Sequence, residues 1–216
     1  MEIFKELSPA GSVVGSLKDD IAKEVGGNCK VILCASHDTA SAYEAIDSDD
    51  DSIILSSGTW SLIGAKIKEA STSELSMKSN FANEGGCGYF RYLKNIMGMW
   101  IPNQLLKEYK DLSIGDLVNK CYESKYEKVF DVNDASLVSP ASMKEAVFAL
   151  IGESSAGFNE IDLFKSVFDS LALSYKNAID ELEKILKKKF DSIYIVGGGA
   201  KNKYLNEVTE KITNKK

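Results

Sequence analysis

The most regular hydrophobic pattern in the chain lies between residues 159 and 189. Apolar side chains recur there at steps of three and four residues: Phe164, Val167, Phe168, Leu171, Tyr175, Ala178, Ile179, Leu182, Ile185 and Leu186. This spacing predicts an amphipathic helix of about eight turns. Asn159 is suited to cap its first turn, and the three lysines at 187–189 lie at its C-terminal end, where the helix dipole favours positive charge.

A different pattern follows this helix. The short apolar run at 192–196 predicts a strand, and it leads through Gly197-Gly198-Gly199 into a second helix that begins near Asn202. Helix, strand, glycine turn and helix in this order predict an α/β fold with a parallel or mixed sheet. Ligands in such folds bind beyond the carboxyl ends of the strands, which is where the three glycines are expected.

The first part of the chain predicts shorter elements. A polar helix is expected near residues 17–25, followed by a buried strand at 31–34 and a small-residue helix at 39–46 that packs on this strand. Two strands, at 52–56 and 60–67, flank Ser57-Gly58-Thr59, which has the composition of a tight β-turn.

The middle of the chain is less regular. Residues 68–85 are polar and are expected to be irregular, and 110–158 predicts short helical pieces separated by turns. Between them, the spacing of apolar residues from Leu93 to Tyr109 predicts a helix with a kink or break at Pro102.

Composition excludes several functional classes. With 216 residues, 44% of them hydrophobic, the chain can form one sizeable domain, or one domain and part of another. The net charge of -6 argues against nucleic-acid binding, and no apolar run approaches the roughly 20 residues that span a bilayer. The N-terminus is not a signal peptide, and four cysteines without a C-x-x-C pair argue against a zinc site. We therefore expect a cytoplasmic protein with reduced thiols.

Three motifs each allow two interpretations. The glycines at 197–199 form either a simple tight turn or a surface that a nucleotide can approach closely, and they lack the P-loop and dinucleotide-binding spacings. The Ser57-Gly58-Thr59 turn is either an ordinary hairpin turn or a source of N–H and O–H donors to phosphate. Asp38 is suited either to cap the next helix or to act in catalysis.

Taken together and in order, four segments resemble the FGGY family of carbohydrate kinases, most closely its rhamnulokinase branch. They are CASHDTASA (34–42), LSSGTWSLIG (55–64), NFANEGGCGYFRYLKNIMGMW (80–100) and IVGGGAKNKYLN (195–206). The resemblance implies an α/β, ribonuclease-H-like domain of the actin and Hsp70-like ATPase superfamily, with a mixed sheet flanked by helices. It also implies ATP and Mg²⁺ as cofactors.

The resemblance assigns roles to individual residues. Asp38 matches the family's general base, which accepts the proton of the attacking sugar hydroxyl. His37, Thr39 and Asn95 match residues that bind the substrate. The nucleotide-binding residues implied are Thr59, Gly198, Gly199, Asn202 and either Asn103 or Gln104.

The implied reaction is phosphorylation of a ketose, with L-rhamnulose converted to L-rhamnulose 1-phosphate as the favoured case. L-Fuculose and D-xylulose are alternative substrates. A competing hypothesis is a non-catalytic, actin-like nucleotide-binding or regulatory module. The Ser-His-Asp-Thr block at 36–39 favours the kinase, because such a module has no use for it.

The resemblance also implies a division of the chain. Residues 1–30 correspond to the end of the N-terminal kinase domain and the hinge, and residues 31–216 to the C-terminal nucleotide-binding domain, incomplete at its C-terminus. Nothing in the sequence matches the Asp-x-Gly loop with which the family begins. We therefore expect the chain to need the missing N-terminal domain as a partner and to be inactive alone. The surface that this domain covers is expected to favour self-association, so a homo-oligomer is compatible with the sequence.

Overall fold

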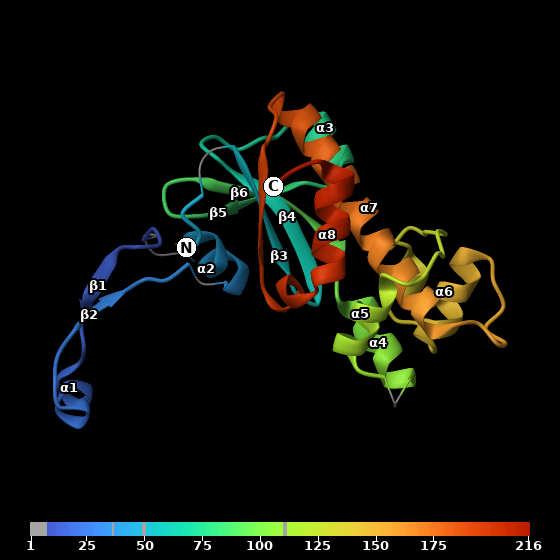
Figure 1. The fold of residues 1–216 in the computed structure, drawn as a ribbon. Coiled ribbons are helices and arrows are strands. Elements are labelled where there is room, and N and C mark those ends of the chain that lie inside the picture. The colour runs from blue at the N-terminus through green and yellow to red at the C-terminus, as the bar shows by residue number, and fades with distance from the viewer. Residues whose placement is uncertain (1–7, 36, 49–50, 110–111) are drawn as a thin grey trace.

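The computed structural model describes residues 8–35, 37–48, 51–109 and 112–216. Its centre is a five-stranded sheet with the strand order β5-β6-β4-β3-β7 (Figure 1). The strands are β3 (Ser52–Ser57), β4 (Trp60–Ile67), β5 (Ala82–Gly85), β6 (Phe90–Met97) and β7 (Ser192–Val196). β3 pairs with β7 in parallel and with β4 antiparallel, so the sheet is mixed, as predicted.

Helices cover both faces of this sheet. The long α7 (Glu160–Leu186) crosses one face with α8 (Lys203–Thr213) beside it, and α2 (Asp38–Glu44) lies on the other (Figure 1). The alternation of β3 explains this arrangement, because Ile53 and Leu55 enter the core beneath α7, whereas Ile54 packs with Tyr43 of α2. Each such buried side chain contributes about 1.5–3 kcal/mol to folding.

The strongest sequence prediction, the amphipathic helix, is confirmed. α7 begins after Asn159, whose side-chain oxygen accepts the Ile161 N–H at 2.8 Å. It ends at Lys187, which adopts a left-handed conformation with φ 51°. Beside its N-terminal half lies a group of short helical elements: α4 (Trp100–Glu108), α5 (Ile114–Cys121), η1 (Ala135–Leu137) and α6 (Met143–Ile151). None of the described helices is long and apolar enough to cross a membrane.

The predicted helix from Leu93 to Tyr109 is wrong in its first part. The residues before Gly98 belong to strand β6, which pairs with β4 and β5. Tyr92 and Ile96 face the core beneath α7 and Leu93 packs on the α2 side, which is a strand alternation. Pro102 does not kink a helix, because it lies in the first turn of α4. Backbone N–H groups have no partner within the helix at this position, so the proline removes no helical hydrogen bond.

Two further predictions need correction. The region 68–85 contains α3 (Glu74–Lys78) and β5 as well as irregular backbone. The predicted buried strand at 31–34 is instead β2 (Lys30–Ile32), which pairs with β1 (Val13–Ser16) in a separate two-stranded sheet and is exposed. α2 therefore packs on β3 rather than on this strand.

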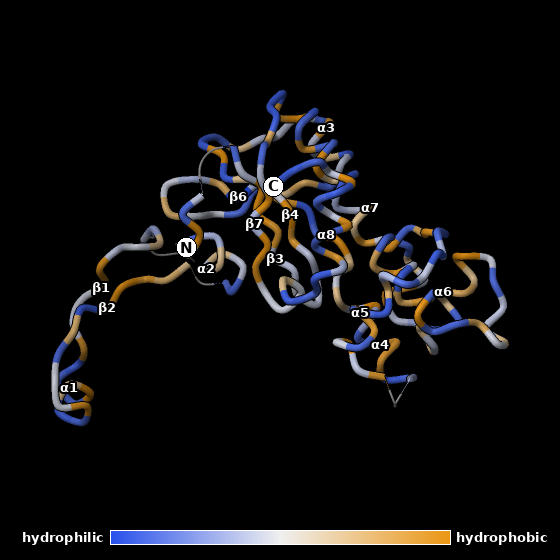
Figure 2. Tube along the Cα trace, in the orientation of Figure 1, coloured by the Kyte–Doolittle hydropathy of each residue, from blue (hydrophilic) through white to orange (hydrophobic). Residues whose placement is uncertain are grey.

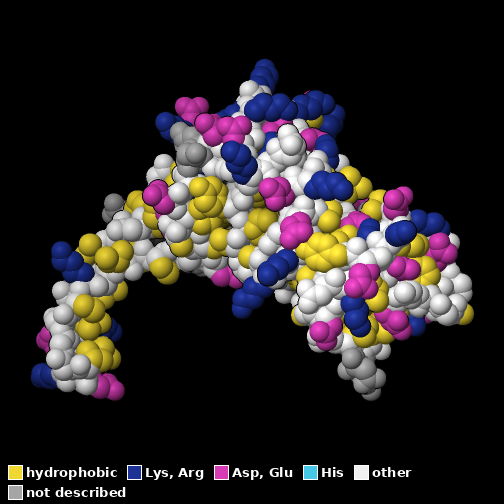
Figure 3. Space-filling model, in the orientation of Figure 1, with side chains coloured by type: hydrophobic (Ala, Val, Ile, Leu, Met, Phe, Trp, Pro, Cys, Tyr) yellow, Lys and Arg dark blue, Asp and Glu magenta, His cyan; other side chains and the backbone are white. Residues whose placement is uncertain are grey.

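These two strands and α1 (Asp19–Val25) form an arm that projects from the body (Figures 1 and 2). α1 ends, as predicted, at Gly26, whose φ is 73°. The arm exposes apolar side chains, including Val14 at 61% and Ile32 at 57% of their surface (Figure 3). The arm thus lacks a core of its own among the described residues.

Candidate active site

The turn between β3 and β4 lies at the centre of the candidate site. Gly58 and Thr59 form this turn, and the chain leaving β6 is hydrogen-bonded to both residues. The Met99 N–H donates to the Gly58 carbonyl at 3.0 Å, and the N–H groups of Gly98 and Trp100 donate to the Thr59 carbonyl at 3.2 and 3.0 Å. The chain leaving β6 therefore holds the backbone of this turn in place, and Thr59 remains exposed.

A cavity of about 450 Å³ lies on the α2 side of this turn. Its lining consists of His37, Asp38, Thr39, Ser56, Gly58, Thr59, Trp60, Leu62, Glu84 and Asn95. All four residues to which the sequence assigned substrate binding or catalysis, His37, Asp38, Thr39 and Asn95, are in this lining. After the roles expected for these residues, we call it the catalytic cavity.

Asp38 is the first residue of α2, and its side chain is 94% exposed. One carboxylate oxygen accepts the Thr39 N–H at 2.7 Å and lies 3.4 Å from Nδ1 of His37. Asp38 is therefore not the cap of α2, because the N-cap residue is His37, but its carboxylate accepts an N–H group of the first turn and belongs to the cavity lining.

The helix that carries Asp38 is anchored at its other end. The Tyr43 hydroxyl donates to the Ile54 carbonyl of β3 at 3.2 Å. The Glu44 carboxylate accepts the Tyr89 hydroxyl at 2.8 Å and the Cys87 N–H at 2.9 Å. Burial opposes ionisation of Glu44, but these hydrogen bonds outweigh it and lower the pKa of the carboxyl. They connect α2 to both the sheet and the loop between β5 and β6.

The sequence analysis missed Glu84, a second carboxylate of the catalytic cavity. Its side chain is paired with Nη1 of Arg91 at 2.9 Å, and the Arg91 side chain is only 5% exposed. Glu84 and Arg91 are directly opposite each other on β5 and β6. Arg91 is the chain's single arginine, and its buried guanidinium requires a nearby acceptor. The sequence carried no signal for this pair, because it follows from the pairing of β5 with β6.

A larger cavity, of about 720 Å³, lies on the other side of the same turn. Its lining consists of Gly58, Thr59, Met99, Asn103, Ile114, Gly115, Val118, Asn119, Gly198, Gly199, Lys201, Asn202 and Lys203. All the predicted nucleotide-binding residues are here except Gln104, which accepts a hydrogen bond from Lys107 at 3.2 Å. Sequence reasoning missed the contribution of α5. After the ligand expected for these residues, we call this the nucleotide cavity.

The three consecutive glycines have three different surroundings. Gly197 has φ 90°, a backbone conformation that side chains disfavour. A Cβ on Gly199 would lie 2.0 Å from Oγ of Ser57, so this residue packs against β3. A Cβ on Gly198 would meet no described atom within 4 Å, so this position faces open space in the cavity lining.

Asn202 gives the nucleotide cavity a buried polar group. The residue is 5% exposed, and its side-chain oxygen caps α8 by accepting the Leu205 N–H at 3.1 Å. Its Nδ2 group has no hydrogen-bond partner among the described residues. An unsatisfied buried donor costs about 1–3 kcal/mol, so a ligand acceptor in this cavity would relieve a penalty already present.

Solved structures that are similar in shape define the class of fold. The chain superposes on a xylulose kinase from Rhodospirillum rubrum with a TM-score of 0.70 and 13% identity, over 96% of this chain and 43% of that one. It superposes on Plasmodium falciparum glycerol kinase with ADP with a TM-score of 0.68 and 12% identity, over 96% and 42% of the two chains. The chain therefore shares its fold with about two fifths of each of these kinases.

Sequence comparison gives the family. The model described as "FGGY family of carbohydrate kinases, C-terminal domain" matches residues 53–216. Proteins named rhamnulokinase, from Oceanobacillus iheyensis and Halalkalibacterium halodurans, are 36% and 38% identical over 99% of this chain. The chain belongs to the FGGY family of carbohydrate kinases. It spans about half the length of these relatives, namely 46% and 47%.

Proposed function

We propose that this chain supplies the nucleotide-binding half of the active site of an ATP-dependent sugar kinase. The observation that carries the proposal is the position of the two cavities, which share Gly58 and Thr59. A phosphoryl group can pass between two bound substrates only where their sites meet. Here the shared wall is a turn in which the exposed Thr59 offers its hydroxyl to phosphate.

In this proposal, the nucleotide occupies the larger cavity. Its volume of about 720 Å³ lies within the usual range for small-molecule sites. Gly198 allows the adenosine to approach the backbone, and Nδ2 of Asn202 donates to an acceptor on it. Asn103 makes the nucleotide contact that the sequence left open between Asn103 and Gln104, because only Asn103 lines the cavity.

Asp38 acts as the general base in the catalytic cavity. The sugar oxygen forms a bond to the γ-phosphorus as the bond from that phosphorus to the bridging oxygen of ADP breaks. The hydroxyl proton passes to the Asp38 carboxylate. Because phosphoryl transfer depends mainly on positioning, an anchored helix matters as much as basicity. His37, Thr39 and Asn95 orient the sugar.

Mg²⁺ remains an expectation that comes from the family resemblance. Among the described residues, no group of three or more His, Cys, Asp or Glu side chains could hold a metal ion. The proposal therefore assigns no step to a metal ligand of this chain.

L-Rhamnulose is the substrate that we favour, with L-rhamnulose 1-phosphate as the product. The support is the name rhamnulokinase carried by relatives that are 34–38% identical to this chain. The family membership alone is equally compatible with L-fuculose or D-xylulose, so the substrate needs a direct test.

We also propose a division into two parts. Residues 1–30 belong with an N-terminal domain and its hinge. We extend this part to Ile32, because β2 pairs with β1. The rest of the chain forms the nucleotide-binding domain. Residues 1–7 lie outside the described part of the chain. The exposed apolar residues of the arm, among them Val14 and Ile32, would pack on that N-terminal domain.

Two measurements test the proposed function. Calorimetric titration of the 216-residue chain with ATP should show saturable binding, and Gly198→Val should weaken it. Coupled ADP release by the protein that contains this chain should depend on added ketose and be fastest with L-rhamnulose. Nucleotide binding without ketose-dependent ADP release would instead support a regulatory module. Faster ADP release with L-fuculose or D-xylulose would make that ketose, rather than L-rhamnulose, the preferred substrate.

A further inference from the structure

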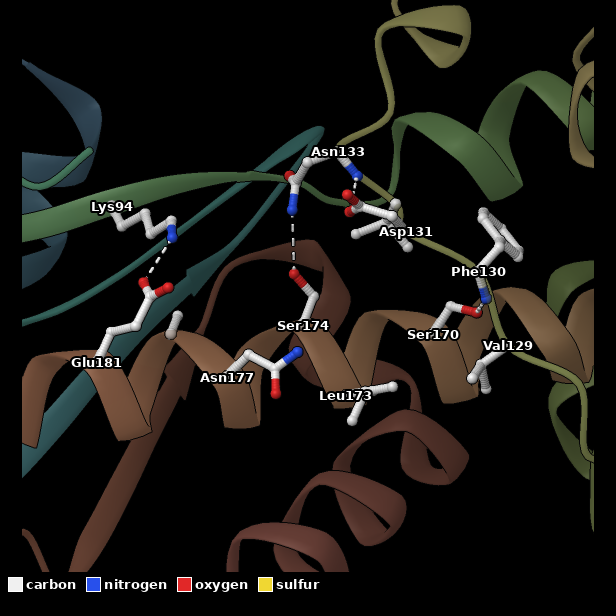
Figure 4. Close-up of a pocket in the computed structure, with 12 residues that line it drawn as sticks. Lys94, Val129, Phe130, Asp131, Asn133, Ser170, Leu173, Ser174, Asn177 and Glu181 are labelled. Carbon is white, nitrogen blue, oxygen red and sulfur yellow. Dashed lines mark hydrogen bonds and ion pairs between the residues drawn. The ribbon is translucent and has the colours of Figure 1, made fainter. Parts of the chain in front are cut away.

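A third cavity, of about 470 Å³, lies on the α7 side of the sheet. We call it the α7 groove. Its lining consists of Lys94, Val129, Phe130, Asp131, Val132, Asn133, Ser170, Leu173, Ser174, Asn177, Ala178 and Glu181 (Figure 4). Strand β6 separates this groove from the catalytic cavity, because Lys94 lines the groove and the next residue, Asn95, lines the catalytic cavity.

The groove has a polar end and an apolar end. At one end Nζ of Lys94 is paired with Glu181 at 2.6 Å, and near the middle Nδ2 of Asn133 donates to the Ser174 hydroxyl at 3.2 Å (Figure 4). At the other end Leu173 and Val129 expose 37% and 42% of their surface.

These groups favour a neutral ligand with many hydroxyl groups. Amide, hydroxyl and carboxylate side chains provide both donors and acceptors, as a polyol requires. The apolar end can cover the C–H face of a sugar ring. The lining contains one cationic side chain, Lys94, and two carboxylates, Asp131 and Glu181. Its net charge is therefore negative, and an anionic ligand would be repelled.

Hydrogen bonds connect the groove to the turn between the other two cavities. The side-chain oxygen of Asn133 accepts the Met97 N–H at 3.1 Å, at the end of β6. The next residue, Gly98, donates its N–H to the Thr59 carbonyl at 3.2 Å. A ligand that moves the Asn133 side chain would therefore act on Thr59 through two successive backbone groups.

We propose that the α7 groove is a second binding site, for a neutral polyhydroxylated molecule of about monosaccharide or disaccharide size, and that its occupancy shifts the Gly58-Thr59 turn. The volume suits such a ligand. The site does not depend on the proposed kinase activity, because none of its lining residues belongs to the catalytic or nucleotide cavity.

The test is NMR titration of the ¹⁵N-labelled 216-residue chain with D-glucose and with sucrose. Saturable shifts are expected for the side-chain amides of Asn133 and Asn177 and for the backbone amides of Met97 and Gly98. Asn177→Ala should weaken binding at least about threefold, because one hydrogen-bonding group is lost. Lys184→Ala, an exposed change on the same helix but outside the groove, should leave the affinity unchanged.

A second variant separates binding from coupling. The Asn133→Ala variant should still bind the sugar, although more weakly, so the Asn177 side-chain amide should still shift on titration. The accompanying chemical-shift changes of Gly98 and Thr59 should be lost. Thermal melting checks that each variant is folded. Shifts confined to Asn95 and its neighbours would place the sugar in the catalytic cavity and overturn the proposal. So would the absence of saturable shifts, or tighter binding of glucose 6-phosphate than of glucose.

Discussion

The nucleotide and catalytic cavities share one turn but are built in different ways. The nucleotide cavity includes groups that pack against other elements, such as Gly199 and Asn202, the latter 5% exposed. In the catalytic cavity, the side chain of Asp38 is 94% exposed. Changes at packed positions such as Gly199 should therefore affect folding as well as binding. Changes at an open position such as Asp38 should affect activity without affecting stability.

The largest expected effect follows from the exposure of Asp38. In the protein that contains this chain, Asp38→Asn should lower kcat by about a hundredfold or more, as expected for loss of a general base. Its melting temperature and ATP affinity should stay near those of the wild type. Steady-state kinetics, calorimetry and thermal melting measure these three quantities.

Asp20→Asn is the matched control, because it removes a carboxylate from the arm, outside both cavities. Near-normal turnover by Asp38→Asn would remove this residue from the mechanism. A large loss of stability would contradict the view of the catalytic cavity as an open surface.

The next effect is on stability in the nucleotide cavity. Gly199→Val places a Cβ 2.0 Å from Oγ and 2.8 Å from Cβ of Ser57. Overpacking of this kind costs about 1–3 kcal/mol, so denaturant unfolding should shift to lower concentration. Unchanged unfolding of Gly199→Val would show that the glycine turn does not depend on close packing against β3.

Gly198→Val separates ligand contact from packing within the same turn. Its Cβ meets no described atom within 4 Å, so the unfolding curve should match that of the wild type. The added side chain nevertheless fills space beside the proposed adenosine site. ATP affinity measured by calorimetry should fall at least about tenfold, equivalent to about 1.4 kcal/mol. Normal affinity would place the adenosine elsewhere, and a loss of both stability and affinity would make this glycine structural.

The sequence predicted those parts of the molecule that depend on local patterns. The helix α7 could be found from its periodicity and its Asn159 cap, and the glycine turn from its place after an apolar run. Strand β6 was misread because Leu93, Ile96 and Met97 also fit helical spacing, and only pairing with β4 and β5 decides between the two. The choice between Asn103 and Gln104 depends on the rotation of α4, which local sequence does not determine.

Contacts between distant segments could not be predicted. Glu44 is bonded to Cys87 and Tyr89, more than forty positions away. Ser61 and Tyr175 form a buried hydrogen bond of 2.7 Å between β4 and α7. Such pairs arise only when the sheet has formed. The family resemblance named residues that, apart from Gln104, line the two cavities, but it did not identify those that hold them in place.

The smallest expected effect concerns the pH dependence of the contacts that anchor α2. The pKa of Glu44 is lowered in the folded protein, because the Cys87 and Tyr89 hydrogen bonds outweigh the effect of burial. A carboxyl with a depressed pKa contributes stability that is fully present above its unfolded pKa, near 4.5, and is lost as the pH falls through the folded value. Glu44→Gln should therefore be slightly less stable than the wild type near neutral pH, and the two melting temperatures should converge below this range. Glu24→Gln, an exposed change on α1, should show no such convergence. If the difference between Glu44→Gln and wild type were constant down to low pH, the ionised carboxylate would not be what anchors α2, and its buried residues, Tyr43 among them, would hold it on the sheet.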